Sequence, residues 1–278
     1  MNRHFMKFDF GNIHYTQIDS GKEVTLVLLH AFHSSADSYV QLCERLKDHC
    51  NLVCLDFPGH GQSDHIDCEQ YGYYYSMAGF TDVLVEFIAR LGLTNYVIAG
   101  DSIGGNCTIR GLSKLPGIRG MILMGTAQAR SAEIIFQLHH ESEALTRLFQ
   151  KHRTQAEDEL VTAAYVDPSV NGGKNFQLML KDIQRIDPNC REYLSAQIES
   201  QPWVDEIEIL QQTTVPYCYI LGEQDGFINT PYYRDALIEA GVKAEVIHVL
   251  PNCRHVPYLD DLSASARIMT DFIEQHLN

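Results

Sequence analysis

The segment from Gly100 to Gly104, with the sequence Gly-Asp-Ser-Ile-Gly, constrains the fold more than any other part of the chain. It follows the apolar run 96–99 and precedes a segment, 106–115, with the pattern of a helix. A serine between a strand and a helix, with a glycine two residues away on each side, is typical of a strained turn that raises the serine hydroxyl above the edge of a sheet. Side chains on the two glycines would collide with the neighbouring strand and helix. We therefore predict that Ser102 is a nucleophile.

A serine nucleophile needs a base that takes its proton and an acid that orients the base. In chains with this kind of turn, both partners follow the serine, the acid first and the histidine second, each after a strand. The β-rich run 215–221 leads into a turn that carries Asp225, our predicted acid, and Glu223, the alternative. Of the 13 histidines, His255 alone lies between the last predicted strand, 244–250, and the final predicted helix. We predict His255 as the base.

Two backbone amides are expected to bind the negative charge that develops on a reacting carbonyl oxygen. One is the amide of Ile103, directly after the nucleophile, and the other is the amide of Phe32, in the loop after the buried strand 24–29. Such amides act through their position rather than through their side chains, and losing one typically costs about a hundred- to a thousandfold in rate. His33, in the same loop, is a candidate for substrate contact.

Strand and helix patterns alternate over the first part of the chain. We expect a hairpin over 5–18, strands over 24–29, 52–55, 96–99 and 120–124, and helices over 37–47, 76–91 and 106–115. Alternation of this kind predicts parallel strands joined by right-handed crossovers, with ligands bound at the carboxyl ends of the strands. All three predicted catalytic residues follow such strand ends.

The pattern changes between residues 127 and 213, which carry helical periodicity and no convincing strand. The helical segments cover 132–149, 155–165, 175–186 and 191–200. Because the core pattern resumes afterwards, we expect 1–126 and 214–278 to form the core domain and 127–213 to form an inserted helical cap. A cap over the sheet edge would enclose an apolar pocket. Ile134, Phe136 and Trp203 are candidates for its substrate contacts.

These features resemble the α/β-hydrolase superfamily over nearly the whole chain. The segment 56–64 is similar to the D-x-P-G-x-G-x-S segment of that superfamily, and 75–80, 91–93, 120–126 and 222–225 resemble N-acyl-homoserine lactonases of the α/β-hydrolase type. The resemblance implies an α/β fold with a mostly parallel eight-stranded sheet, flanked by helices and carrying the cap. It also implies a serine hydrolase that cleaves a small carboxylic ester or lactone through an acyl-enzyme, with an acyl-homoserine-lactone-type substrate as one candidate.

Three positions depart from the pattern of the family. Ala31 and Arg254 stand where the family usually carries glycine, and Asp225 stands where the lactonases carry Glu. We expect the first two to change the shape of the site without removing a reacting group. A carbon–carbon bond hydrolase of the same fold and a ligand receptor with little turnover remain alternatives.

Asp101 is an alternative nucleophile, as in dehalogenases and epoxide hydrolases. It would place Ala99 and Ile103 at the positions that require small residues, so the spacing favours Ser102. Metal and cofactor motifs are absent: neither H-x-H-x-D-H nor H-E-x-x-H occurs, and neither do the glycine-rich phosphate loops. His139 and His140 are adjacent on a predicted helix and would point about 100° apart. We therefore expect no metal and no cofactor.

The charge balance excludes several classes of partner. The chain has 36 acidic and 21 basic side chains and a formal net charge of −15. Because phosphate binding needs clustered Lys and Arg, we expect no nucleic-acid partner and no docking on anionic membranes. The first ten residues lack the apolar stretch of a secretory signal, and the eight cysteines show no C-x-x-C spacing. We expect a cytoplasmic protein with reduced cysteines that acts on a small molecule, as a monomer or a homodimer.

Overall fold

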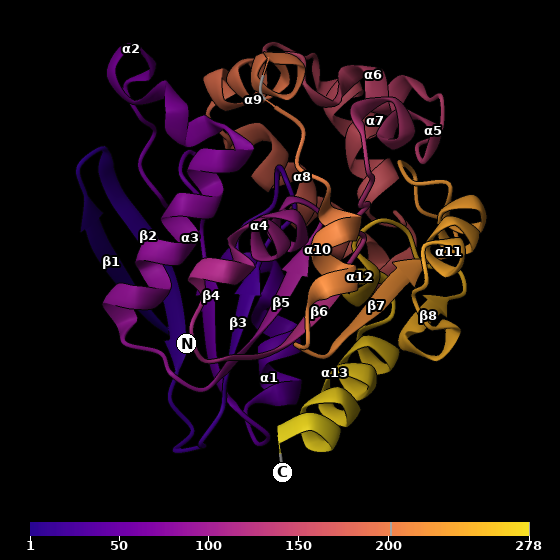
Figure 1. Cartoon of the computed structure of the whole chain (residues 1–278). Helices are drawn as coiled ribbons and strands as arrows, with labels where there is room; N and C mark the ends of the chain where they lie inside the picture. The colour runs from indigo at the N-terminus through magenta and orange to yellow at the C-terminus, as the bar shows by residue number, and fades with distance from the viewer. Residues whose placement is uncertain (201, 278) are drawn as a thin grey trace.

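A computed structural model describes residues 1–200 and 202–277. It contains the expected eight-stranded sheet, with the strand order β1-β2-β4-β3-β5-β6-β7-β8 (Figure 1). The strands are β1 (Asn2–Phe8), β2 (Gly11–Ile18), β3 (Thr25–Leu29), β4 (Asn51–Leu55), β5 (Tyr96–Asp101), β6 (Ile118–Met124), β7 (Tyr217–Gly222) and β8 (Ile247–Leu250).

The sheet is mostly parallel, as predicted. Strand β2 pairs antiparallel with both β1 and β4, and every other neighbouring pair is parallel. All residues of the interior strands β3 and β5 are buried. Strands covered on both faces read as continuous apolar runs, which is why 24–29 and 96–99 are visible in the sequence.

Helices cover the sheet and connect its strands. Those outside the 127–200 region are α1 (Val40–Leu46), α2 (Cys68–Tyr71), α3 (Met77–Leu91), α4 (Ile103–Gly111), α10 (Glu206–Gln212), α11 (Thr230–Glu239), α12 (Pro257–Asp260) and α13 (Leu262–Leu277). Short 3-10 turns are η1 (Ala36–Tyr39), η2 (Gly72–Tyr75), η3 (Leu112–Lys114), η4 (Val170–Gly173) and η5 (Ala244–Val246). Helix α4 packs against α3 on one side and α10 on the other, and α1 packs against α13.

Five further helices gather beyond the carboxyl ends of the parallel strands, at the top of Figure 1. They are α5 (Ala132–Gln137), α6 (Glu143–Leu148), α7 (Gln155–Tyr165), α8 (Lys174–Arg185) and α9 (Pro188–Ser200). Helix α7 begins at a capping box between Thr154 and Glu157 and has the predicted bounds. The division of the chain into a core (1–126 and 214–278) and a cap (127–213) stays a prediction.

The prediction of one helix over 132–149 was wrong, because this segment folds as two short helices, α5 and α6. Between them, His139 forms an isolated antiparallel bridge with Ile228, and the His140 N–H donates to the Phe227 carbonyl at 2.8 Å. The side chain of Ser142 then caps α6 by accepting from the Leu145 N–H. A serine with this capping role starts a new helix, and the apolar periodicity continues across the break. The adjacent histidines therefore do not lie on a helix.

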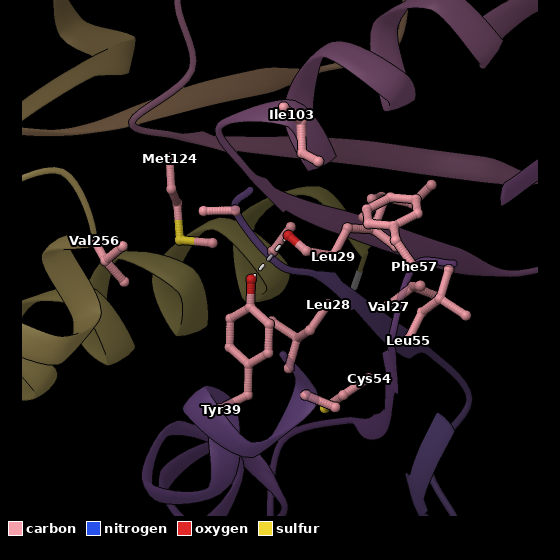
Figure 2. Close-up of a cluster of buried hydrophobic side chains, with 14 of the residues drawn as sticks. Val27, Leu28, Leu29, Tyr39, Cys54, Leu55, Phe57, Ile103, Met124 and Val256 are labelled. Carbon is pink, nitrogen blue, oxygen red and sulfur yellow. Dashed lines mark hydrogen bonds between the residues drawn. The ribbon is translucent and has the colours of Figure 1, made fainter. Parts of the chain in front are cut away.

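Tyr39 fixes the carboxyl end of β3 from below. Figure 2 shows its ring among buried side chains, with its hydroxyl donating to the Leu29 carbonyl at 2.9 Å. The ring is fully buried and stacks on Tyr258 with ring centroids 4.7 Å apart. This contact supports the strand end from which the loop containing Phe32 departs. In the described part of the chain, no helix combines the length and the apolar character needed to cross a membrane.

We expect Tyr39→Phe to lower the free energy of unfolding by about 0.5–1.5 kcal/mol, the net value of one buried hydrogen bond, because only the hydroxyl is removed. Urea unfolding measures the change. Tyr232→Phe is the matched control, because Tyr232 is 48% exposed, and its effect should stay within about 0.5 kcal/mol. Equal effects of the two substitutions would contradict the role of the Tyr39 hydroxyl.

Candidate active site

Ser102 occupies a strained turn between β5 and α4. Its backbone has φ 52° and ψ −115°, a left-handed conformation that side chains rarely adopt. A Cβ on Gly100 would lie 2.5 Å from the backbone of Gly104, and a Cβ on Gly104 would lie 2.5 Å from the Leu29 carbonyl oxygen. Helix α4 therefore approaches β5 and β3 this closely because both positions are glycine, which is the reason that the sequence suggested.

His255 and Asp225 lie against each other, although 29 residues separate them in the chain. The His255 Nδ1 is 2.8 Å from the Asp225 Oδ2, and both side chains are buried. The other carboxylate oxygen of Asp225 accepts the N–H groups of Phe227 and Ile228, both at 2.8 Å. Because a carboxylate only accepts hydrogen bonds, the proton of the neutral imidazole lies on Nδ1, and Nε2 is free to act as a base. Glu223, the alternative acid, is exposed.

The surroundings of His255 act on its pKa in opposite directions. Burial lowers the pKa, while the negative charge of Asp225 and the hydrogen bond to it raise the pKa. Together with a smaller raising effect of Asp101, the two effects of Asp225 prevail, so that the pKa of His255 lies above its ordinary value. The rings of Phe227 and Tyr165 stand edge-on to the imidazole, at 5.0 and 5.3 Å between centroids, and limit its movement.

A cavity of about 310 Å³ brings Ser102 and His255 together. Its floor consists of residues from the loops that follow five parallel strands, because the carboxyl ends of such strands meet at one edge of the sheet. These floor residues are Phe32, Ser102, Ile103, Gly125, Ala127, Phe227, Ile228 and His255. Side chains from the 127–200 region form much of the remaining wall, which is mostly apolar.

The two predicted amide donors, Phe32 and Ile103, both belong to residues that line this cavity. Among the described residues, neither backbone N–H donates a hydrogen bond to the protein. The loop of Phe32 is braced by His30, whose Nδ1 lies 2.8 Å from the Ala31 carbonyl and whose Nε2 accepts the Phe57 N–H at 2.9 Å. Two free amides beside a serine are the arrangement that binds an oxyanion.

The four predicted substrate contacts divide into two pairs. Phe136 and Trp203 line the cavity, and the Trp203 indole is held by donating to the Ala129 carbonyl at 2.9 Å. His33 does not line it, because its ring is fully buried behind Phe32 and Tyr165. Ile134 is also absent from the lining and is exposed. The next two residues of the short helix α5, Ile135 and Phe136, line the cavity instead, since successive residues of a helix point about 100° apart.

Three polar residues of the cavity wall have no predicted role: Asn106, Arg110 and Glu206. The first two lie four and eight residues after Ser102 on α4, so the helical repeat places them on the face of the helix that carries the serine. That spacing is readable in the sequence. Glu206 carries no such signal, because α10 reaches α4 from about a hundred residues further along the chain.

Arg254, which replaces the usual glycine before His255, points away from the cavity. Its guanidinium donates to the Ala163 carbonyl and pairs with Asp167, with Nη2 3.7 Å from the carboxylate. On the other side of His255, the Val256 N–H donates to the Tyr165 carbonyl at 3.0 Å. The loop of the histidine is thus attached to the end of α7, and the side chain that departs from the family pattern does not line the cavity.

Asp101 is a buried carboxyl group next to the serine. It is fully buried and absent from the cavity lining, and neither oxygen has a hydrogen-bond partner among the described residues. Burial raises its pKa to about 8, with a lowering effect of His255 and a raising effect of Asp225. A carboxyl group in this position cannot reach a substrate in the cavity, which supports the choice of Ser102. No group of three or more possible metal ligands occurs in the described part of the chain.

Comparisons with known proteins agree with this architecture. A family model described as serine aminopeptidase, S33, matches residues 21–261. A 2-succinyl-6-hydroxy-2,4-cyclohexadiene-1-carboxylate synthase of Yersinia pestis is 27% identical over 212 residues, which cover 72% of each protein. Among solved structures, the N-acyl homoserine lactonase AidH in complex with N-hexanoyl homoserine lactone has a TM-score of 0.87 at 20% identity, covering 100% of this chain and 99% of that one. The esterase RhEst1 of Rhodococcus sp. ECU1013 has a TM-score of 0.81 at 20% identity, covering 99% and 100%.

Asp101 makes the stability of the fold depend on pH. Because the pKa of Asp101 is about 8 in the folded chain and about 4 in an unfolded one, the unfolded chain loses this proton first as the pH rises. The carboxyl group therefore lowers the free energy of unfolding progressively between about pH 4 and pH 8. Asp101→Asn keeps a neutral group of the same shape.

We expect the variant to gain a few kcal/mol, as an order of magnitude, relative to the unmodified protein across this pH range. Urea unfolding of both proteins at a series of pH values measures the difference between their free energies of unfolding. The other titrating groups are common to both proteins, so their contributions cancel to first order in this difference. A difference that does not change with pH would show that the folded protein does not hold Asp101 in its neutral form.

Proposed function

The chain belongs to the serine aminopeptidase, S33, family, and from that premise we propose that it hydrolyses a small carboxylic ester or lactone through an acyl-enzyme. It is a hydrolase with the α/β-hydrolase fold, and what remains to be proposed is its mechanism and its substrate. One observation carries the proposal. The serine of a strained turn opens into the same cavity as a histidine whose other ring nitrogen is bound to a buried carboxylate.

In the proposed mechanism, His255 Nε2 takes the proton of the Ser102 hydroxyl while the serine oxygen attacks the carbonyl carbon. Asp225 keeps the Nδ1 proton in place and stabilises the imidazolium that forms. The amides of Phe32 and Ile103 bind the oxyanion. When the tetrahedral intermediate collapses, the imidazolium returns its proton to the leaving alcohol. Water, activated by the same histidine, then hydrolyses the acyl-enzyme and regenerates the serine.

Lactones are the first candidates within the ester class. AidH, which matches the whole chain in fold, is a lactonase whose structure holds an N-acyl homoserine lactone. Here, a cavity of about 310 Å³ with a mostly apolar wall provides room for a small ring and an acyl chain of similar size. Ring opening leaves the alcohol tethered to the acyl group, so a single substrate has to fit the cavity in both steps.

Carbon–carbon bond chemistry is the second candidate. The curated relatives at 26–27% identity are named as synthases of a cyclohexadiene carboxylate rather than as esterases. The same serine, base and amide donors would serve a carbonyl whose leaving group is carbon, provided that the site stabilises the carbanion.

We also propose a role for the helical segment over the site and a cellular location. Residues 127–213 would act as a cap that limits the access of water, because helices α5, α6, α7 and α9 all contribute to the cavity wall. A cytoplasmic location is supported by the eight cysteines, all of which are free.

We expect Ser102→Ala to lower kcat for an activated short-chain ester by several powers of ten while the protein stays folded, because the variant lacks the attacking oxygen. Circular dichroism serves as the control for folding. A fluorophosphonate probe should label the unmodified protein and not the variant. Near-normal turnover by the folded variant would refute the assignment of the nucleophile, and stoichiometric labelling of the unmodified protein without ester turnover would favour a receptor.

A substrate panel tests the proposed class. We expect hydrolysis of p-nitrophenyl esters of short and medium acyl length, and ring opening of N-acyl homoserine lactones under the same conditions, both abolished in Ser102→Ala. Turnover of the esters without any ring opening would remove the lactone proposal and keep the esterase. Failure of both, together with cleavage of a vinylogous diketone, would favour the carbon–carbon hydrolase.

A further inference from the structure

Helix α4 carries a line of polar side chains that starts at the proposed nucleophile. Ser102, Asn106 and Arg110 are four residues apart and all line the same cavity. Residues at this spacing share one face of a helix, and eight residues correspond to about 12 Å along the axis. The cavity thus extends along α4 from the reacting serine to an arginine more than two helical turns away.

The far end of this line is a hydrogen-bonded cluster with Glu206 of α10. Arg110 Nε donates to Glu206 Oε1 at 2.5 Å, and Asn106 Nδ2 donates to Glu206 Oε2 at 2.6 Å and to the Ala127 carbonyl at 3.0 Å. The Glu206 side chain is 2% exposed and that of Arg110 19%. Both carboxylate oxygens therefore already have donors, and the cluster holds the guanidinium in a fixed position.

Arg110 keeps donors that the protein does not use. Among the described residues, its two terminal nitrogens have no hydrogen-bond partner, and neither is among the buried atoms that lack one. They therefore remain accessible. Apart from this polar line, the cavity wall is mostly apolar and includes Ile135, Phe136 and Trp203. A ligand that lies along α4 would meet the serine at one end and the free N–H donors of Arg110 at the other, beside a mostly apolar wall.

We propose that Arg110 determines substrate specificity by binding a neutral oxygen acceptor, such as a hydroxyl or oxo group, at the end of the acyl chain remote from the reacting carbonyl. This inference rests on the proposed function and narrows its substrate class. The acceptor is neutral because the charge of Arg110 is already balanced by Glu206. An anionic group would have to share the guanidinium with that buried carboxylate, and two like charges in one site repel each other.

Three p-nitrophenyl esters of equal chain length test the proposal: octanoate, 8-hydroxyoctanoate and the suberate monoester. We expect kcat/KM of the unmodified enzyme to be about tenfold or more higher for the hydroxy ester than for octanoate, the effect of a hydrogen bond to a charged group. The suberate monoester should fall below the hydroxy ester. A higher kcat/KM for the suberate monoester than for the hydroxy ester would overturn the proposal of a neutral acceptor and indicate that Arg110 binds an anion.

In Arg110→Gln, the ratio of kcat/KM for the 8-hydroxyoctanoate ester to kcat/KM for the octanoate ester should fall close to one. Because this variant leaves Glu206 without its charge partner and can misfold, the double variant Arg110→Gln/Glu206→Gln is measured beside it, with circular dichroism for both. Arg130→Gln is the matched control, since it removes an arginine–carboxylate pair, with Asp205, from outside the cavity lining. It should keep the ratio of the unmodified enzyme.

The failure of this inference is distinguishable from that of the proposed function. p-Nitrophenyl acetate is too short to reach Arg110 and reports on the serine alone. No hydrolysis of acetate or octanoate would contradict the proposed function. Hydrolysis of both with equal kcat/KM for octanoate and 8-hydroxyoctanoate, or a ratio that survives in a folded Arg110 variant, would overturn the role of Arg110 and leave the esterase intact.

Discussion

The site depends on the close packing of α4 against β5 and β3. The left-handed backbone of Ser102 costs on the order of 1–3 kcal/mol, which the surrounding structure has to offset. It can do so because Gly100 and Gly104 let the helix lie where a Cβ on either residue would be 2.5 Å from backbone atoms. The same packing directs the serine into the cavity, aligns Asn106 and Arg110 along one helical face, and presents the free amide of Ile103.

The remaining parts of the site follow from the parallel sheet. Strands that run in one direction deliver their following loops to one edge, so Phe32, Ser102, Asp225 and His255 meet there from four different strands. The Asp225 carboxylate takes part in three hydrogen bonds, two of them from backbone N–H groups, which hold it in place in the absence of a ligand. A preorganised carboxylate raises the pKa of His255 against the opposing effect of burial.

What the sequence could predict were features with local signals. The strand–turn–helix context of Ser102 and the continuous apolar runs of β3 and β5 are each contained in a few neighbouring residues. The break in 132–149 was missed because its cause, the bridge between His139 and Ile228, joins residues far apart in the chain. Ile134 and His33 were misplaced for a related reason, since a pattern marks a residue as apolar or polar but does not say toward which neighbour it turns. No local pattern marks Glu206, because its contact with Asn106 depends on α10 lying beside α4.

The attachment of α7 to the histidine loop has a consequence for how substrate enters. Hydrogen bonds from Arg254 and Val256 to the carbonyls of Ala163 and Tyr165 lie on both sides of His255. The Gly226 N–H next to Asp225 donates to the Ala164 carbonyl at 3.3 Å. Moving α7 outward would break these hydrogen bonds and displace His255 and Asp225, so we expect this helix to stay in place when a ligand enters. Phe136 of α5 lines the cavity although 69% of it is exposed, so the cavity wall reaches solvent at this residue. Movement of this side chain would break none of the hydrogen bonds that hold His255 and Asp225.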